Sequence, residues 1–435
     1  MVRCSHSWGN QPPKTVLTDT RLLTVDGNGL ALRGGPVVHE FQSSGQPQPA
    51  LPYPPTMTIN LIAGIPATND TFFHAIRFAA GDPAALIECD GHRLLIIRDI
   101  EMARAKANAR ADEVRCPADF MPNGGLSGDR ETATAQATAE AIRQRGVDAV
   151  RSDRTLPLSF VAALGDVGVT VNYDADFGVL ERRVKDDVEL DALRTAQGDT
   201  QDAIAKACET IAQATADGDG LLQHDGDTLT SERVRTLIDI HLLAAGYQNP
   251  TCIVAGGPQG ADCHNVGQGA LRTGEPIIID VFPCSKSTKY NGDCTRMVVH
   301  GEVPPAVERM HAAVLAAKIA GEQVAKAGVT GERVNAATTA VIIEHGYELG
   351  LPAEDADAGR IAMVHGTGHG VGLSVHEPPL LDVGGPPLLA GDVITIEPGL
   401  YGPAVGGLRL EDMVVVTESG CEDLGSGLQL GMCWT

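Results

Sequence analysis

Residues 365–379 have the sequence HGTGHGVGLSVHEPP, which sets three histidines among four glycines. His365 and His369 are four residues apart, as two ligands on one face of a helix would be. Glycines at every second position from 366 to 372 argue against a helix, because glycine is a poor helix former. They are typical of a loop or strand whose backbone approaches a ligand closely. The stretch therefore predicts a close-packed segment that presents imidazole groups.

Carboxylates that follow apolar residues lie on both sides of this stretch, at Asp280, Asp293, Glu397 and Glu411. Taken singly, each has an ordinary explanation, since an Asp at a strand end is usually a turn or cap residue. A Glu near Arg409 is more often a paired surface charge. Taken together with one imidazole, the carboxylates could bind two divalent cations, because four negative charges offset two doubly positive ions.

The donor types narrow the choice of metal. Oxygen-rich ligation with one nitrogen favours Mn²⁺, leaves Co²⁺ or Zn²⁺ as alternatives, and argues against a thiolate-type zinc site. Buried without metal, the same carboxylates would repel one another, and several would take up protons. The pattern therefore predicts two bound divalent metal ions.

The bulk composition is that of a globular protein and excludes several classes. The 435 residues are 43% hydrophobic and 20% charged, which allows a sizeable core and at least two domains. The formal net charge of −23 argues against nucleic-acid binding. No apolar run approaches the roughly 18 residues that span a bilayer, and no secretory signal is evident. The ten cysteines contain no Cys-x-x-Cys pair, which predicts reduced thiols in a cytoplasmic protein.

Composition also divides the chain into segments. Residues 1–56 are predicted to be flexible, because they end in a Pro-, Gln- and Ser-rich run without any period. They are either a genuine disordered tail or an over-extended gene start ahead of Met57. Residues 57–180 predict an α/β domain with a mixed or parallel sheet and no catalytic cluster. Residues 186–425 predict an α+β domain, and 426–435 a short tail.

Periodicity and turn residues locate the expected helices and strands. Asp90 and Gly91 between two apolar runs predict a hairpin. Asp187 is predicted to cap a long helix after a charge-rich linker at 181–189. The predicted helices span 103–111, 132–145, 306–327 and 332–344, with others after 187 and 231, and the predicted strands span 84–87, 94–97, 148–150, 167–171, 277–279, 297–300, 393–396 and 413–416.

Three segments are similar to the signatures of one enzyme family. They are HGTGHGVGLSVHEPP (365–379), DVFPCSKSTKYNGDCTRMVVHG (280–301) and IEPGLYGP with GLRLEDMVVVTESG (within 396–420). Through them the chain resembles the M24-type metallopeptidases, which include creatinase, aminopeptidase P and prolidase. The resemblance covers residues 60–425, including ERRVKDDVELDALRTA at the junction between domains. It implies an α+β pita-bread catalytic domain preceded by a smaller α/β creatinase-like N-terminal domain.

The resemblance also implies roles for individual residues. The implied metal ligands are Asp280, Asp293, His369, Glu397 and Glu411. His365 and His376 fall at the positions of the family's substrate-contacting histidines, and Arg409 at that of an arginine that orients site carboxylates. His264 matches the family's upstream catalytic histidine, although the residues alone would also allow a solvated loop histidine.

The implied activity is hydrolysis of the Xaa-Pro peptide bond, of aminopeptidase or prolidase type, with a metal-bridging hydroxide as nucleophile. His376, with His365, would stabilise the oxyanion, and Glu397, or else Glu411, would carry a proton to the leaving nitrogen. By composition, Arg409 is a candidate for binding the carboxylate of a dipeptide. The alternatives are a small-molecule C–N hydrolase, of creatinase or ectoine-hydrolase type, and a non-catalytic binding module. The implied partners are a peptide with proline at its second position and a second copy of the chain, without nucleic acid or membrane.

Overall fold

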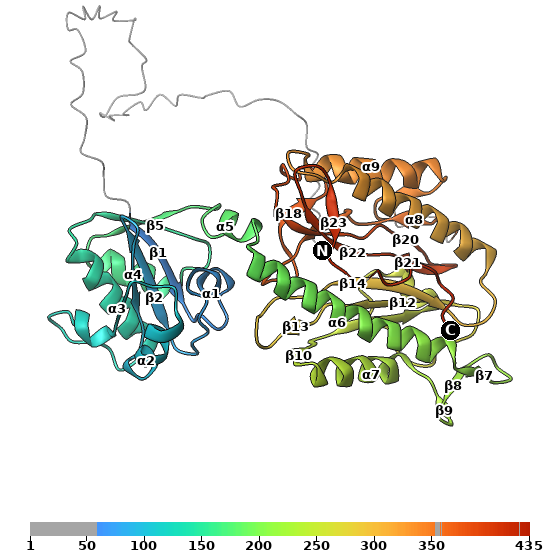
Figure 1. Ribbon diagram of the computed structural model, residues 1–435, viewed down its shortest axis with the longest axis horizontal. Coiled ribbons are helices and arrows are strands. Elements are labelled where there is room, and N and C mark those ends of the chain that lie inside the picture. Colours follow the sequence, from blue (N-terminus) through green and yellow to red (C-terminus); the bar gives the residue numbers. More distant parts are fainter. Residues whose placement is uncertain (1–58, 353–356, 358, 426) are drawn as a thin grey trace, which may run out of the picture. The chain divides into compact units, whose positions relative to one another are not determined.

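The computed structural model describes residues 59–352, 357, 359–425 and 427–435, and Figure 1 labels its elements. The segment 1–56, predicted to be flexible, lies outside these residues. Among the described helices, none combines the length and the apolar character that crossing a bilayer requires.

The first part of the described chain contains a six-stranded sheet. Its strands are β1 (Ile59–Gly64), β2 (Ala84–Cys89), β3 (His92–Ile96), β4 (Glu113–Arg115), β5 (Ala149–Ser152) and β6 (Thr170–Tyr173). Their order is β4-β3-β2-β1-β5-β6, with antiparallel pairing within β1–β2–β3 and parallel pairing elsewhere, so the sheet is mixed. The predicted hairpin is confirmed, because Asp90 and Gly91, with φ of 49° and 78°, join β2 to β3 in a two-residue turn.

Helices cover both faces of this sheet, because its side chains alternate between two apolar clusters. Ile59 and Leu61 of β1 pack with α3 (Arg130–Arg143) and α4 (Leu158–Asp166). Other side chains of the sheet pack on the opposite face with α1 (Asp70–Ile76) and α2 (Asp99–Asn108). This is a helix–sheet–helix layering.

The strand predicted at 167–171 begins later than expected, at Thr170. Val167 and Gly168 instead complete the C-terminal turn of α4, where Gly168 has a φ of 81°. Glycine adopts this left-handed conformation without steric cost, so the helix end displaces the strand.

The segment predicted to be a linker is partly helical. It contains α5 (Leu180–Arg183) and leads into the long helix α6 (Asp187–Ala212). The cap of α6 is Asp186, so the predicted cap, Asp187, is wrong by one residue. The Asp186 carboxylate accepts a hydrogen bond from the N–H of Glu189, and the Glu189 carboxylate accepts one from the N–H of Asp186, both at 2.9 Å. This capping box requires its first member three residues before the Glu, and Asp186 has that spacing.

The second part of the described chain consists of α6, three further helices and several small sheets. The helices are α7 (Ser231–Ala244), α8 (Pro305–Val324) and α9 (Gly331–Glu344), close to their predicted positions. Three of these sheets concern the site, and their strands are β11 (Cys252–Gly256), β12 (Pro276–Val281), β14 (Cys294–Val299), β15 (Glu348–Leu349), β16 (Ala362–Met363), β17 (Gly368–Gly370), β18 (Glu377–Leu381), β19 (Val393–Ile396), β20 (Gly399–Gly402), β21 (Gly406–Arg409), β22 (Asp412–Val416) and β23 (Cys421–Asp423). Their orders are β11-β12-β14, β15-β16-β20-β21 and β18-β17-β19-β22-β23.

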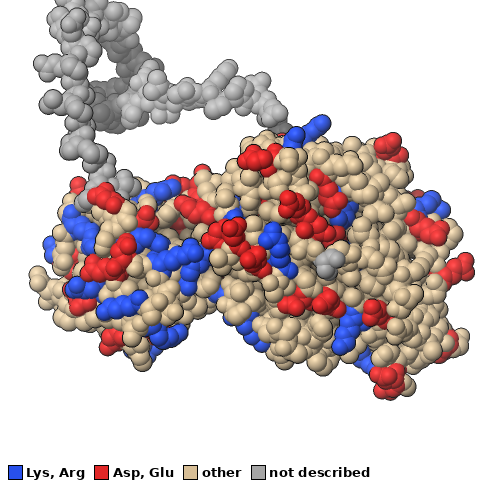
Figure 2. Space-filling view, in the orientation of Figure 1, with Lys and Arg blue, Asp and Glu red and all other residues tan. Residues whose placement is uncertain are grey.

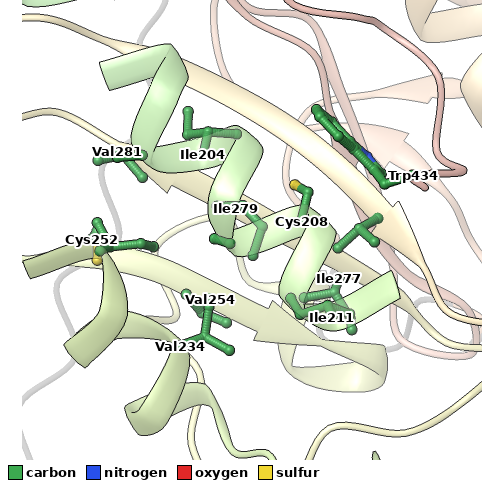
Figure 3. Packing of buried hydrophobic residues seen from close by; sticks show 14 of the residues in the cluster. Ile204, Cys208, Ile211, Val234, Cys252, Val254, Ile277, Ile279, Val281 and Trp434 are labelled. Carbon is green, nitrogen blue, oxygen red and sulfur yellow. The ribbon is translucent and has the colours of Figure 1, made fainter. Parts of the chain in front are cut away.

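A buried apolar cluster fixes α6 and α7 against β11 and β12. In Figure 3, Ile204 and Cys208 of α6 lie over Ile277 and Ile279 of β12, and all four side chains are at most 1% exposed. The end of the chain joins this cluster through Trp434, whose Nε1 donates a hydrogen bond to the carbonyl of Met297 at 2.9 Å. The burial of these side chains stabilises β12, which carries Asp280, against the helices.

The surface charge is mixed despite the acidic composition of 56 Asp and Glu against 33 Lys and Arg. On the face shown in Figure 2, acidic and basic side chains are interspersed. The acidic residues visible there are distributed over that face rather than gathered in one patch.

Candidate metal centre

Strand pairing brings three carboxylates together. Asp280, near the end of β12, pairs with Thr295 of β14, and Thr295 forms a bridge to Glu411 just before β22. Asp293 immediately precedes β14. The Asp280, Asp293 and Glu411 side chains line the same cavity.

The neighbouring sheet supplies His369 and Glu397. His369 lies on β17, and Glu397 follows β19, whose Ile396 pairs with Asp412 of β22. The Nε2 atom of His369 lies 3.2 Å from Glu397 Oε1 and 3.8 Å from Asp293 Oδ2. The donor atoms of Asp293, His369 and Glu411 lie within 4.8 Å of one another. The structure thus brings all five predicted ligands to one place.

The donor set fits divalent cations. Four carboxylates and one imidazole nitrogen are hard, mainly oxygen ligands of the kind that Mn²⁺ accepts. Asp280 Oδ1 is buried without a hydrogen-bond partner among the described residues. A buried carboxylate oxygen with no partner is costly, so a ligand at this position would relieve that cost. His369 Nδ1–H can donate to the carbonyl of Gly370 at 3.1 Å, which directs Nε2 toward the carboxylates.

The pKa values reflect the crowding of like charges. Burial, followed by the charges of Glu411, Asp280 and Glu397, raises the pKa of Asp293 well above its usual range. Burial and the charges of Glu397 and Asp280 do the same for Glu411. Burial also acts to raise the pKa of Glu397, but the hydrogen bond and charge of His369 outweigh it and bring the pKa to about 2. The four carboxylates together therefore carry more negative charge than the neighbouring cationic side chains neutralise.

Several residues that sequence reasoning missed hold these ligands in position. Thr295 Oγ1 donates to Glu411 Oε2 at 2.7 Å, and Thr395 Oγ1 to Glu397 Oε1 at 3.2 Å. Gln197 of α6 binds the backbone of Asp293 at both its N–H and its carbonyl, each at 2.9 Å. Thr295 and Gln197 are distant in sequence from the residues that they hold, whereas Thr395 lies only two residues before Glu397.

The glycines around His369 serve close packing between strands. A Cβ at Gly368 would lie 2.1 Å from the carbonyl oxygen of Thr395, and one at Gly370 would lie 2.4 Å from that of Pro378. Adjacent strands thus account for these two glycines, while Gly366 and Gly368 also line the cavity, so close approach of the backbone to a ligand stays a prediction. Larger residues would push the strand that carries His369 out of register.

The cavity that contains the five ligands has a volume of about 820 Å³, and the three other predicted histidines also line it. His376 is exposed, and its ring centroid lies 4.3 Å from that of His369. Burial, followed by the charge of His369, lowers the pKa of His376. His264 is exposed as well, so it is solvated and yet belongs to the site.

His365 is engaged on both of its ring nitrogens. Nδ1 lies 2.8 Å from the carbonyl of Gly366, so it carries a proton and donates. Nε2 lies 2.8 Å from the Tyr401 hydroxyl, which donates to it. Among the described residues, none forms a ring-nitrogen hydrogen bond with His376. Of these two histidines, His376 is therefore the one with a nitrogen available to a substrate.

Arg409 lies between Tyr401 and the metal ligands. Its Nη1 donates to the Tyr401 hydroxyl at 2.7 Å, its Nη2 to Asp280 Oδ2, and its Nε to Thr295 Oγ1 at 3.2 Å. Tyr401 and Arg409 thus connect His365 to Asp280, a predicted metal ligand, in an unbroken line of hydrogen bonds. Such a chain fixes the orientation of each member.

Fold and site together place carboxylates and a histidine that could hold metal ions on a mixed α and β scaffold. The sequence profile of metallopeptidase family M24 matches residues 191–418, which is more than half of the chain. The chain belongs to metallopeptidase family M24. The predicted family is thereby confirmed.

Curated relatives match somewhat more than half of the chain. A protein of Mycobacterium tuberculosis named probable dipeptidase PepE is 32% identical over 242 residues, which are 55% of this chain and 57% of that protein. An Xaa-Pro dipeptidase of Pyrococcus furiosus is 29% identical over 257 residues, 58% of this chain and 69% of that protein. The chain thus matches little more than half the length of the mycobacterial relative.

Solved structures extend the likeness to the whole described fold. The prolidase of Pyrococcus horikoshii OT3 superposes with a TM-score of 0.68 and 22% identity, over 86% of this chain and 94% of that one. The X-Pro aminopeptidase of Thermotoga maritima MSB8 also gives 0.68, with 25% identity, over 86% and 96% of the two chains. These likenesses confirm the predicted pita-bread fold class.

Proposed function

We propose that this protein is a dinuclear-metal peptidase that hydrolyses the bond between an N-terminal residue and a following proline. The observation that carries the proposal is the meeting of Asp280, Asp293, His369, Glu397 and Glu411 in one cavity. Proline specificity is supported by likeness alone, since relatives and neighbours bear the names Xaa-Pro dipeptidase, prolidase and X-Pro aminopeptidase.

Two divalent cations held by these five residues would supply Lewis acidity for the scissile carbonyl and a water acidic enough to attack near neutral pH. The chain's own groups do the rest. His376, exposed in the cavity, donates a hydrogen bond to the developing oxyanion. The Glu397 carboxylate receives the proton of the attacking water and delivers it to the prolyl nitrogen, with Glu411 as the alternative. His365, Tyr401 and Arg409 hold Asp280 in position.

The oxygen-rich donor set supports Mn²⁺ as the metal. The described cysteines are all unpaired, which supports a reducing compartment such as the cytoplasm. We infer a homodimer from the family resemblance, and a peptide as the partner in the cavity. Mixed charge on the face in Figure 2 supports the absence of a nucleic-acid partner.

The test is hydrolysis by Mn²⁺-loaded protein of an Xaa-Pro dipeptide, an Xaa-Pro-Xaa tripeptide, and the same peptides with Pro replaced by Ala. Cleavage confined to the Pro peptides, and lost on chelation, is the expected result. If protein shown to contain two metal ions cleaves none of these peptides, the proposal is wrong. The alternative activity, hydrolysis of a C–N bond in a small molecule, would then be favoured.

Substituting Tyr401→Phe is expected to lower kcat about tenfold, because Arg409 and His365 each lose a buried hydrogen-bond partner. KM and metal content should stay close to those of the parent, because Tyr401 is not among the described residues that line the cavity. Steady-state kinetics with metal analysis provides the measurement, and the exposed Tyr173→Phe is the matched control. A change in KM alone would show that Tyr401 contacts the substrate instead.

A further inference from the structure

The cavity is lined by apolar as well as by titratable side chains. The apolar residues of its lining include Ile253, Val266, Phe282, Val375, Leu380 and Pro386. Leu380 lies on β18, where exposure alternates along the strand, and it is 50% exposed between the buried Pro379 and Leu381. Apolar lining of this kind suits the ring of a proline and the residue that follows it.

A free carboxylate on that proline would need a cation to receive it. Arg409 is the single Lys or Arg among the described residues that line the cavity. Its three guanidinium nitrogens already bind Asp280, Tyr401 and Thr295, and the residue is 4% exposed. Arg409, which the sequence offered as a candidate for binding a dipeptide's carboxylate, is therefore not free to do so.

The nearest basic residues of the linker are committed elsewhere. Lys185 Nζ donates to Glu377 Oε1 at 2.8 Å, and Arg182 Nη2 to Glu377 Oε2 at 2.6 Å. The Lys185 side chain is 1% exposed and that of Arg182 is 14% exposed. Both side chains pair with Glu377, which lines the cavity, and neither lines the cavity itself, so we do not expect them to bind a substrate.

The cavity also contains negative charge outside the metal cluster. Asp382 lines it and accepts hydrogen bonds from neutral groups, the side-chain amide of Asn335 at 3.3 Å and the N–H of Val383 at 2.7 Å. Two divalent cations would offset the four carboxylates predicted to be ligands. A dipeptide's carboxylate would thus enter a cavity that contains an unneutralised carboxylate and in which no described Lys or Arg side chain is free to pair with it.

We propose that the site accepts substrates in which the carboxyl group of proline is in amide linkage, and discriminates against dipeptides that end in free prolyl carboxylate. This inference rests on the proposed Xaa-Pro activity and assigns the protein to tripeptides and longer peptides. Leu380 lines the cavity and is half-exposed, so it offers an apolar surface where a basic residue on β18 would offer a cation.

The test compares Ala-Pro, Ala-Pro-amide and Ala-Pro-Ala as substrates of the Mn²⁺-loaded protein. The amide and the tripeptide are expected to exceed the dipeptide in kcat/KM by about 10- to 100-fold, the penalty of one unpaired buried polar group. Equal or preferred cleavage of Ala-Pro would overturn this inference and leave the proposed function intact. Absence of cleavage of all three would overturn both.

A variant that adds a cation to the cavity tests whether charge decides the discrimination against dipeptides. Leu380→Arg is expected to raise kcat/KM for Ala-Pro about tenfold, with no such gain for Ala-Pro-amide, because the added cation pairs with the carboxylate. Leu380→Gln, similar in length but neutral, is the control and should not favour the dipeptide. Melting curves check that both variants fold. If folded Leu380→Arg cleaves Ala-Pro no better than Leu380→Gln does, the charge argument fails.

Discussion

Protein carrying Asp293→Asn is expected to bind less metal and to hydrolyse Xaa-Pro peptides about 10³-fold more slowly than the parent. Asp293 is 4% exposed, and its oxygens lie within reach of His369 and Glu411. A neutral amide removes one anionic donor from the cluster, so the remaining ligands hold two doubly charged ions less tightly. Metal analysis after gel filtration and steady-state kinetics provide the measurements.

Stability gives a second readout of the same variant. A metal concentration about 100 times its Kd should stabilise the parent by about 2.7 kcal/mol, and the variant by clearly less. Without metal, Asp293→Asn should melt no lower than the parent, because burial and the neighbouring carboxylates disfavour a negative charge at this position and the amide carries none. Asp202→Asn, exposed on α6, is the control. An Asp293→Asn protein with unchanged metal content and activity would remove Asp293 from the ligand set.

The sequence predicts this site well because its ligands lie in short contiguous motifs. Glycine spacing around His369 and apolar runs before Asp280 and Glu397 are visible locally, and local patterns suffice for secondary structure as well. The hairpin at Asp90 and the helix near residue 331 follow from the same kind of information. Where a prediction slipped, as with the cap at Asp186, a neighbouring residue of the same type competed for the role.

The supporting contacts could not be predicted because they join distant parts of the chain. Tyr401 is tied to His365, 36 residues away, and Gln197 to Asp293, 96 residues away. Charge runs such as 181–189 are usually solvated, since burial of an unpaired charge is costly. Here Arg183 and Lys185 are each only 6% exposed, because Asp392 and Glu377 neutralise them. Without those partners in view, a charge-rich linker was the reasonable expectation.

Arg183→Met is expected to lower the free energy of unfolding by about 3–5 kcal/mol, the cost of leaving a buried carboxylate without its cation. Arg183 Nε and Nη2 donate to the two oxygens of Asp392 at 2.9 and 2.5 Å, and Nη2 also to the carbonyl of Pro387. Asp392 is fully buried. Methionine fills similar space but offers no donor, so the charge of Asp392 would be stranded.

The measurement is urea unfolding of metal-free protein, so that ligand binding does not mask the change. Arg98→Met is the matched control, because Arg98 pairs with Asp82 at 2.8 Å where both side chains are partly exposed, and such pairs contribute about 0–1 kcal/mol. Adding Asp392→Asn to Arg183→Met should recover much of the loss, since it removes the stranded charge and retains an oxygen for the Leu389 N–H. If the double variant is no more stable than Arg183→Met, the loss comes from packing around Arg183 rather than from the buried charge.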